Sequence, residues 1–145
     1  MAAGDNKGIV RRVIEESWSN GNMSVVDELV SSDFVDHDPP PNSDLHGPEG
    51  VKHVAQMFRS GFPDLKVNIE QLLEEGDKVA VRYTFTGTNT GNLLDIQPTN
   101  NRLNVASTDI YRVSNGKIAE RWGGFDTLGL LEQLGIVKLG YNQGS

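Results

Sequence analysis

Residues 102–125 have the sequence RLNVASTDIYRVSNGKIAERWGGF, in which apolar and polar residues alternate on both sides of the turn Ser114-Asn115-Gly116. Because strand side chains point alternately to opposite faces, this pattern predicts a β-hairpin. Asp109 shares one face of that hairpin with four apolar or aromatic residues, Leu103, Val105, Tyr111 and Val113. If this face is buried, burial disfavours the charged form of the carboxyl group, and such a group can act as an acid or base near neutral pH.

The same period of two continues upstream. It predicts four strands in all, at residues 65–73, 78–89, 102–113 and 117–125. The second strand places Tyr83 and Phe85 in phase with two valines, on the face that should pack against helices. These two aromatic residues are either ordinary core or the wall of a pocket, and Arg82 lies on the opposite, outer face.

Apolar residues at helical spacing predict four helices around these strands. They cover residues 5–19, a short segment capped by Ser24, residues 47–62, and residues 126–134 between the cap Asp126 and the terminating Gly135. Residues 34–45 contain Pro39-Pro40-Pro41, which cannot continue a helix or a central strand, so we expect a loop that carries His37. Helices followed by a meandering antiparallel sheet and a last helix indicate an α+β fold in one domain, residues 1–145.

The composition argues against several classes of partner. The net charge is −7 and no cluster of Lys and Arg occurs, so nucleic acid is not expected as a ligand. No apolar run approaches the roughly 18 residues of a membrane span, and residues 1–7 lack the apolar core of a secretory signal. We therefore expect a cytoplasmic protein that engages no membrane.

The ligands of common metal sites are scarce. The chain has no cysteine, which excludes disulfides, thiolate nucleophiles and zinc-thiolate sites. Its three histidines show no metal-ligand spacing, and no glycine-rich phosphate loop is present, so neither a metal nor a cofactor is expected. His46 and His53 should lie on the surface. His37 stands between Asp36 and Asp38, which favour its charged form, and it is either a proton donor or a solvated loop residue.

The stretch from Asp109 to Gly135 resembles the C-terminal hairpin and helix of the SnoaL-like polyketide cyclases, within the nuclear transport factor two-like superfamily. The resemblance continues through further segments in the same register, at residues 33–37, 47–50, 62–64 and 76–79. It implies a strongly curved, mixed or antiparallel sheet wrapped around the N-terminal helices as a cone-shaped barrel, with an apolar pocket inside and a C-terminal helix. It also implies a homodimer that associates through the outer sheet face, near Arg82 and Thr84.

The resemblance breaks at the family's catalytic residues. In the matching cyclases the strand position of Asp109 carries a histidine, which works beside an aspartate on the next strand. An alignment of the hairpins without a gap places that aspartate opposite Gly123, which cannot exchange a proton. Asp126 is the nearest replacement along the chain, but its place before a helix also suits an N-cap.

The alternation of residues 117–125 does not determine which face of this strand points inward. Arg121 alternates in phase with Gly123, and the family alignment favours it pointing inward, where it could pair with Asp109 or a substrate carbonyl. Hydrophobicity favours Trp122 inward instead. A missing side chain at Gly123 widens the pocket in either case.

The resemblance, together with these residues, implies three alternative functions. The first is a cofactor-independent cyclase or isomerase that abstracts a proton next to the carbonyl of a polyketide-like or other small apolar compound. Asp109 would be the base, and His37 or Arg121 the proton partner or enolate stabiliser. The expected substrate-binding residues are Trp122, Tyr83, Phe85 and Asp126. The alternatives are a non-catalytic binding module that has lost the family's aspartate, and an epoxide hydrolase or hydroxylase with two carboxylates and an arginine around a water.

Overall fold

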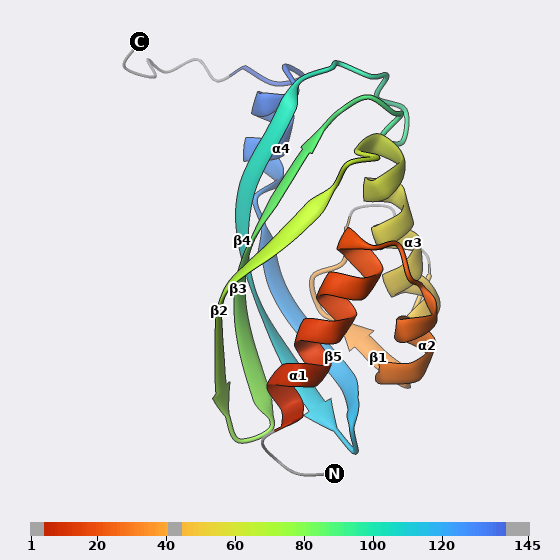
Figure 1. The fold of residues 1–145 in the computed structure, drawn as a ribbon, viewed down its shortest axis with the longest axis vertical. Helices are drawn as coiled ribbons and strands as arrows, with labels where there is room; N and C mark the ends of the chain where they lie inside the picture. Colours follow the sequence, from red (N-terminus) through yellow and green to blue (C-terminus); the bar gives the residue numbers. More distant parts are fainter. Residues whose placement is uncertain (1–4, 41–44, 139–145) are drawn as a thin grey trace.

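The computed structural model describes residues 5–40 and 45–138 and has the expected α+β fold (Figure 1). Two predictions made from the sequence fall partly outside the described residues. They concern residues 1–4 of the N-terminal segment, where no secretory signal is expected, and Pro41 of the predicted loop. No helix in the described ranges is both long and apolar enough to cross a membrane. The helices are α1 (Asn6–Val13), the π-helix η2 (Ile14–Ser19), α2 (Ser24–Leu29), α3 (Gly47–Gly61) and α4 (Thr127–Gln133).

Five strands form one mixed sheet in the order β1-β5-β4-β3-β2. β1 runs parallel to β5, and the other neighbours are antiparallel. Figure 1 shows the long strands curving around α1, with α2 and α3 on the same side of the sheet. The strands are β1 (Val30–Asp36), β2 (Lys66–Glu75), β3 (Lys78–Thr88), β4 (Arg102–Ser114) and β5 (Lys117–Phe125).

The prediction that a loop begins at residue 34 is wrong, because residues 34–36 belong to strand β1. The strand runs to Asp36, and the backbone N–H of His37 still donates to the carbonyl of Arg121 at 2.9 Å. Its register against β5 shifts between Val30 and Val35, so the buried positions do not alternate. An irregular edge strand of this kind leaves no period of two in the sequence.

The first predicted helix is divided in two. The α-helix α1 ends at Val13, and the wider π-helix η2 follows, in which the hydroxyl of Ser17 donates to the carbonyl of Val13. The next helix, α2, lacks the predicted Ser24 cap, because Ser24 is already helical and the side chain of Asn22 accepts its N–H instead. π-helical turns occur often at functional sites, and η2 brings Ile14 and Trp18 to the interior cavity described below.

A bulge decides which face of β5 points inward. Val113 pairs with Ile118, but its neighbour Arg112 pairs with Glu120, so Ala119 is an extra residue in β5. The bulge reverses the phase of the strand at Ala119. Both Ile118 and Arg121 consequently point inward, which a strict alternation forbids.

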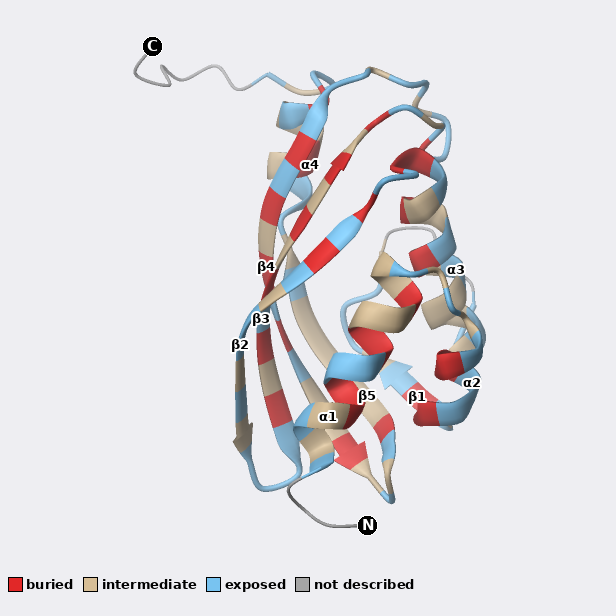
Figure 2. Cartoon of the chain, in the orientation of Figure 1, coloured by how far each residue is buried: buried red, intermediate tan, exposed pale blue. Residues whose placement is uncertain are grey.

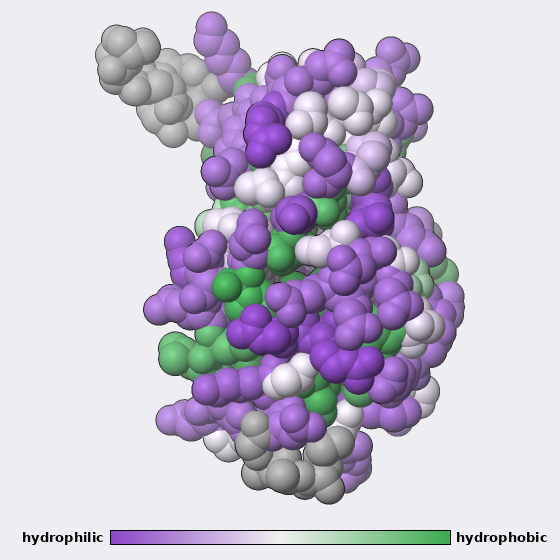
Figure 3. All heavy atoms as spheres, in the orientation of Figure 1, coloured by the Kyte–Doolittle hydropathy of each residue, from purple (hydrophilic) through white to green (hydrophobic). Residues whose placement is uncertain are grey.

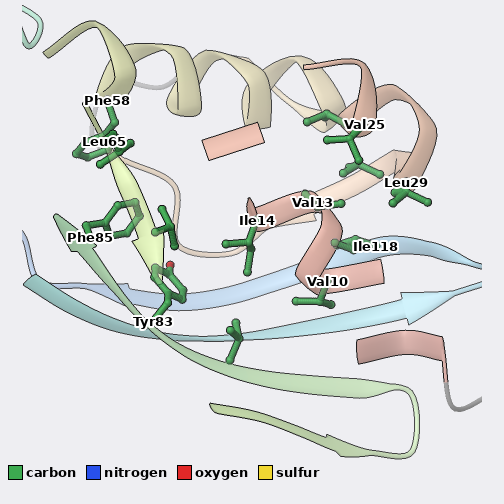
Figure 4. Packing of buried hydrophobic residues seen from close by; sticks show 14 of the residues in the cluster. Val10, Val13, Ile14, Val25, Leu29, Phe58, Leu65, Tyr83, Phe85 and Ile118 are labelled. Carbon is green, nitrogen blue, oxygen red and sulfur yellow. The ribbon is translucent and has the colours of Figure 1, made fainter. Parts of the chain in front are cut away.

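The core lies between the curved sheet and the helices (Figure 2). Figure 4 shows Tyr83 and Phe85 pointing from β3 towards the helical residues Ile14 and Phe58. Burial of one such side chain contributes about 1.5–3 kcal/mol to the free energy of folding. On the face seen in Figure 3, hydrophilic side chains cover most of the surface, and apolar ones emerge between them over the middle of the molecule.

Candidate functional site

A cavity of about 460 Å³ lies between the inner face of the sheet and the helices. Its lining is mainly apolar. Four aromatic rings of the lining cluster around Phe85, whose ring centroid lies 5.1 Å from Trp18, 5.2 Å from both Tyr83 and Phe125, and 6.1 Å from Phe58. Tyr83 and Phe85 are therefore both core residues and cavity walls. The charged residues of the lining are Asp36, Asp38, Asp109 and Arg121.

Asp109 lies at the inner face of β4 with only 1% of its surface exposed, as its phase predicts. Its carboxylate is surrounded by donors, however. Arg121 donates to both oxygens from Nε and Nη2, each at 3.3 Å. The hydroxyls of Tyr83, Tyr111 and Ser107 donate to it as well. Because these donors occupy both oxygens, the geometry suits Asp109 for positioning Arg121 and not for accepting a proton.

Arg121 joins three carboxylate residues at this end of the cavity. Its Nη1 donates to Asp36 Oδ1 and Oδ2 at 2.9 and 3.1 Å and to the Asp38 carbonyl at 3.1 Å. Burial lowers the pKa of Arg121, but its electrostatic interactions with Tyr111, Asp109 and Asp36 outweigh the effect of burial and hold the pKa above its usual value. Arg121 therefore stays protonated and links β1 to β4 through two ion pairs.

The two tyrosines of the network remain neutral at physiological pH. Burial, followed by the neighbouring charge of Asp109, raises the pKa of Tyr83 and that of Tyr111 above the usual value of about 10. Their hydroxyls act as hydrogen-bond donors to Asp109.

Asp38 differs from the other two carboxylates. Its Oδ2 accepts the backbone N–H of Gly123 at 3.0 Å, and the side chain lies at the exposed edge of the cavity. Its Oδ1 has no partner among the described residues. The sequence did carry a signal for Asp36 and Asp38, because in an extended chain they share one face and His37 takes the other.

The ion pair between Arg121 and Asp109 occupies the space that a side chain at position 123 would need. A Cβ atom there would lie 2.3 Å from Arg121 Nη2 and 2.3 Å from Asp109 Oδ1. Any side chain at this position would therefore displace the ion pair.

The structure does not bring His37 or Trp122 to the cavity. They lie on the outer face of the sheet, where their rings stack with centroids 4.9 Å apart and an interplanar angle of 7°. His37 Nε2 lies 2.7 Å from Glu120 Oε2, and this hydrogen bond, with a second one from Arg112, lowers the pKa of Glu120.

Asp126 is the N-cap of α4 and not a lining residue, since its Oδ1 accepts the N–H of Gly129 at 2.9 Å. Within residues 5–40 and 45–138, no group of three His, Cys, Asp or Glu side chains is arranged to hold a metal ion.

Comparisons with known proteins agree with this architecture. A proposed polyketide cyclase from Bacillus cereus ATCC 10987 has a TM-score of 0.77 and 34% sequence identity, and the match covers 88% of this chain and 79% of that one. TsrD from Streptomyces laurentii has a TM-score of 0.83 and 26% identity, with coverages of 94% and 99%. AclR, a proposed hydroxylase from Streptomyces galilaeus, has a TM-score of 0.79 and 25% identity, with coverages of 94% and 84%.

The curated protein sequences include no significant match to this chain. Residues 8–134, nearly the whole length, match the model of one protein family. The chain belongs to the SnoaL-like polyketide cyclase family.

Proposed function

We propose that this protein is a cofactor-independent enzyme that binds a small, polyketide-like or other apolar carbonyl compound in the cavity and abstracts a proton next to the carbonyl. The enolate then closes a ring by aldol addition or is reprotonated as an isomer. The observation that carries this proposal is a largely buried guanidinium together with a carboxylate that keeps one oxygen without a partner among the described residues, both at one end of an apolar cavity. Family membership supports the same class of reaction.

Asp38 is the proposed base in place of Asp109. A general base needs an oxygen that is free to accept the substrate proton. Asp109 has both oxygens engaged by Arg121 and hydroxyl groups, whereas Asp38 holds only the N–H of Gly123 among the described residues. The hydrogen bond to Gly123 fixes the Asp38 carboxylate at the cavity edge.

Arg121 is the proposed enolate stabiliser. A guanidinium has five N–H groups. The acceptors Asp36, Asp38 and Asp109 account for four of them and leave one on Nη2. Because Gly123 has no side chain over Nη2, a substrate oxygen can approach this N–H from the cavity.

Hydrogen exchange tests the proton abstraction directly. Small ketones, esters and anthracycline-like precursors are incubated with the protein in D₂O, and mass spectrometry follows deuterium uptake and ring closure. Asp38→Asn keeps an oxygen for Gly123 and should lower the exchange rate by about 10²- to 10⁴-fold. The matched variant His37→Gln, on the outer face, should retain the wild-type rate. Binding without exchange in the wild type would indicate a binding module instead.

A second function is favoured by Asp36. Asp36 and Asp109 flank Arg121, which is the set of two carboxylates and an arginine that a water-activating epoxide hydrolase needs. The structural similarity to AclR, a proposed hydroxylase, supports the same direction. Turnover of an epoxide in H₂¹⁸O, with ¹⁸O in the diol product, distinguishes this reaction from proton abstraction.

We also propose that two copies associate through the outer face of the sheet. One row of paired residues crosses four strands there: Leu73, Ala80, Ile110 and Trp122. Leu73 is 65% exposed and Ile110 41% exposed, which is unusual for large apolar side chains on an uncovered sheet.

A further inference from the structure

The charges that line the cavity are not balanced. Asp36, Asp38 and Asp109 supply three carboxylates, and Arg121 is the one cationic side chain among the described lining residues. The ionised lining therefore carries one positive and three negative charges.

Arg121 is already engaged by carboxylates. It pairs with Asp36 at 2.9 Å and with Asp109 at 3.3 Å, and its side chain is only 16% exposed. The charge of Asp38 has no cationic partner in the lining. A ligand anion would lose its hydration on entering and would meet repulsion from Asp38, and Arg121, whose charge is already paired with two carboxylates, leaves only one N–H to compensate it.

An uncharged ligand avoids this repulsion throughout the proposed reaction. When Asp38 accepts a proton, its negative charge passes to the substrate oxygen, and the total charge of the cavity does not change. A ligand that is anionic from the start adds a further negative charge. The aromatic cluster around Phe85 packs well against flat rings and also tolerates a cation, because ring faces carry partial negative charge.

We infer that the cavity selects among ligands of one shape by charge: it binds uncharged and cationic forms and rejects carboxylates, and Asp38 is the residue that determines this selectivity. The inference rests on the proposed function in taking this cavity as the ligand site. It restricts the substrate class to ketones, esters or amines with flat apolar skeletons.

Three naphthalene probes of nearly equal shape test the selection. They are 1-naphthylmethanol, protonated 1-naphthylmethylamine and 1-naphthoate, and calorimetry at neutral pH and low salt measures their dissociation constants. We expect 1-naphthoate to bind about tenfold or more weakly than the alcohol, and the amine at least as tightly as the alcohol. In Asp38→Asn, the gap between alcohol and carboxylate should shrink severalfold with little change for the alcohol.

Asp33→Asn is the matched control, because it removes the same charge from an exposed position of β1 outside the lining and should preserve the gap. Equal affinities for the three probes in the wild type, or an unchanged gap in Asp38→Asn, would overturn the charge selection. Failure of all three probes to bind would overturn both this inference and the proposed function. A clear charge ranking without deuterium exchange would leave the selection standing and remove the proposed reaction.

Discussion

At Gly123, one missing side chain controls the geometry of the site. Gly123→Ala would force the new Cβ against Arg121 Nη2 and Asp109 Oδ1, each at 2.3 Å before any shift. We expect the free energy of unfolding to fall by about 2–4 kcal/mol, because a buried ion pair loses its geometry. Urea denaturation measures the change.

The adjacent Gly124 supplies the control for this substitution. A Cβ at Gly124 meets no atom within 4 Å, so Gly124→Ala should change the stability by less than about 1 kcal/mol. Equal losses for the two variants would show that backbone freedom, and not the ion pair, requires glycine at position 123.

The tyrosines bonded to Asp109 make the stability depend on pH at the alkaline end. The pKa of Tyr83 and that of Tyr111 are raised in the folded protein, so above about pH 10 the unfolded chain releases protons that the folded chain keeps. The unfolded state then binds fewer protons, and the stability falls as the pH rises.

Tyr83→Phe removes one of these two titrating hydroxyls, so the stability of the variant should fall less steeply with pH than that of the wild type. Its stability deficit relative to the wild type, measured by urea unfolding, should shrink between pH 9 and pH 11 by up to about 1.4 kcal/mol per pH unit. Phe85→Leu, a neighbouring core variant that does not titrate, should keep a constant deficit. A Tyr83→Phe deficit that stays constant across this range would show that Tyr83 titrates normally.

Among the elements, the connection between β3 and β4 depends on one buried amide. Asn89 is 0% exposed, and it donates to the carbonyls of Gly61 and Gly91 while its Oδ1 accepts from Thr99. These bonds join α3 to the loop that carries Leu93 and Leu94 over the cavity.

Asn89→Ala leaves several buried polar groups without partners and should lower the free energy of unfolding by about 2–3 kcal/mol. Hydrogen exchange should also accelerate in residues 90–100. Asn92→Ala, at an exposed position of the same loop, is the control and should do neither. Loop protection that survives in Asn89→Ala would mean that the apolar contacts of Leu93 hold the loop instead.

For the whole molecule, the outer face of the sheet predicts a homodimer. Sedimentation at micromolar concentration should give twice the chain mass of 15.9 kDa. Ile110→Glu places a charge in the apolar row and should yield the monomer, whereas Leu128→Glu, on exposed α4 surface, should not. Reversal of the charge at Arg82, on the same outer face, offers a second perturbation of the interface. A monomeric mass for the wild type would contradict the predicted homodimer.

Local patterns in the chain were enough to predict the α+β class, the antiparallel strands, the burial of Asp109 and the Asp126 cap. These features depend on side chains two to four positions apart, which the backbone of a strand or helix places on one face. The pairing of Asp36 with Arg121 depends instead on β1 lying beside β5, 85 residues along the chain, and on the bulge at Ala119 that turns Arg121 inward. Neither the register of a parallel edge strand nor a bulge leaves a periodic signal. Only the tertiary structure could therefore decide that, among the described residues, Asp38 and not Asp109 has an oxygen without a partner at the cavity.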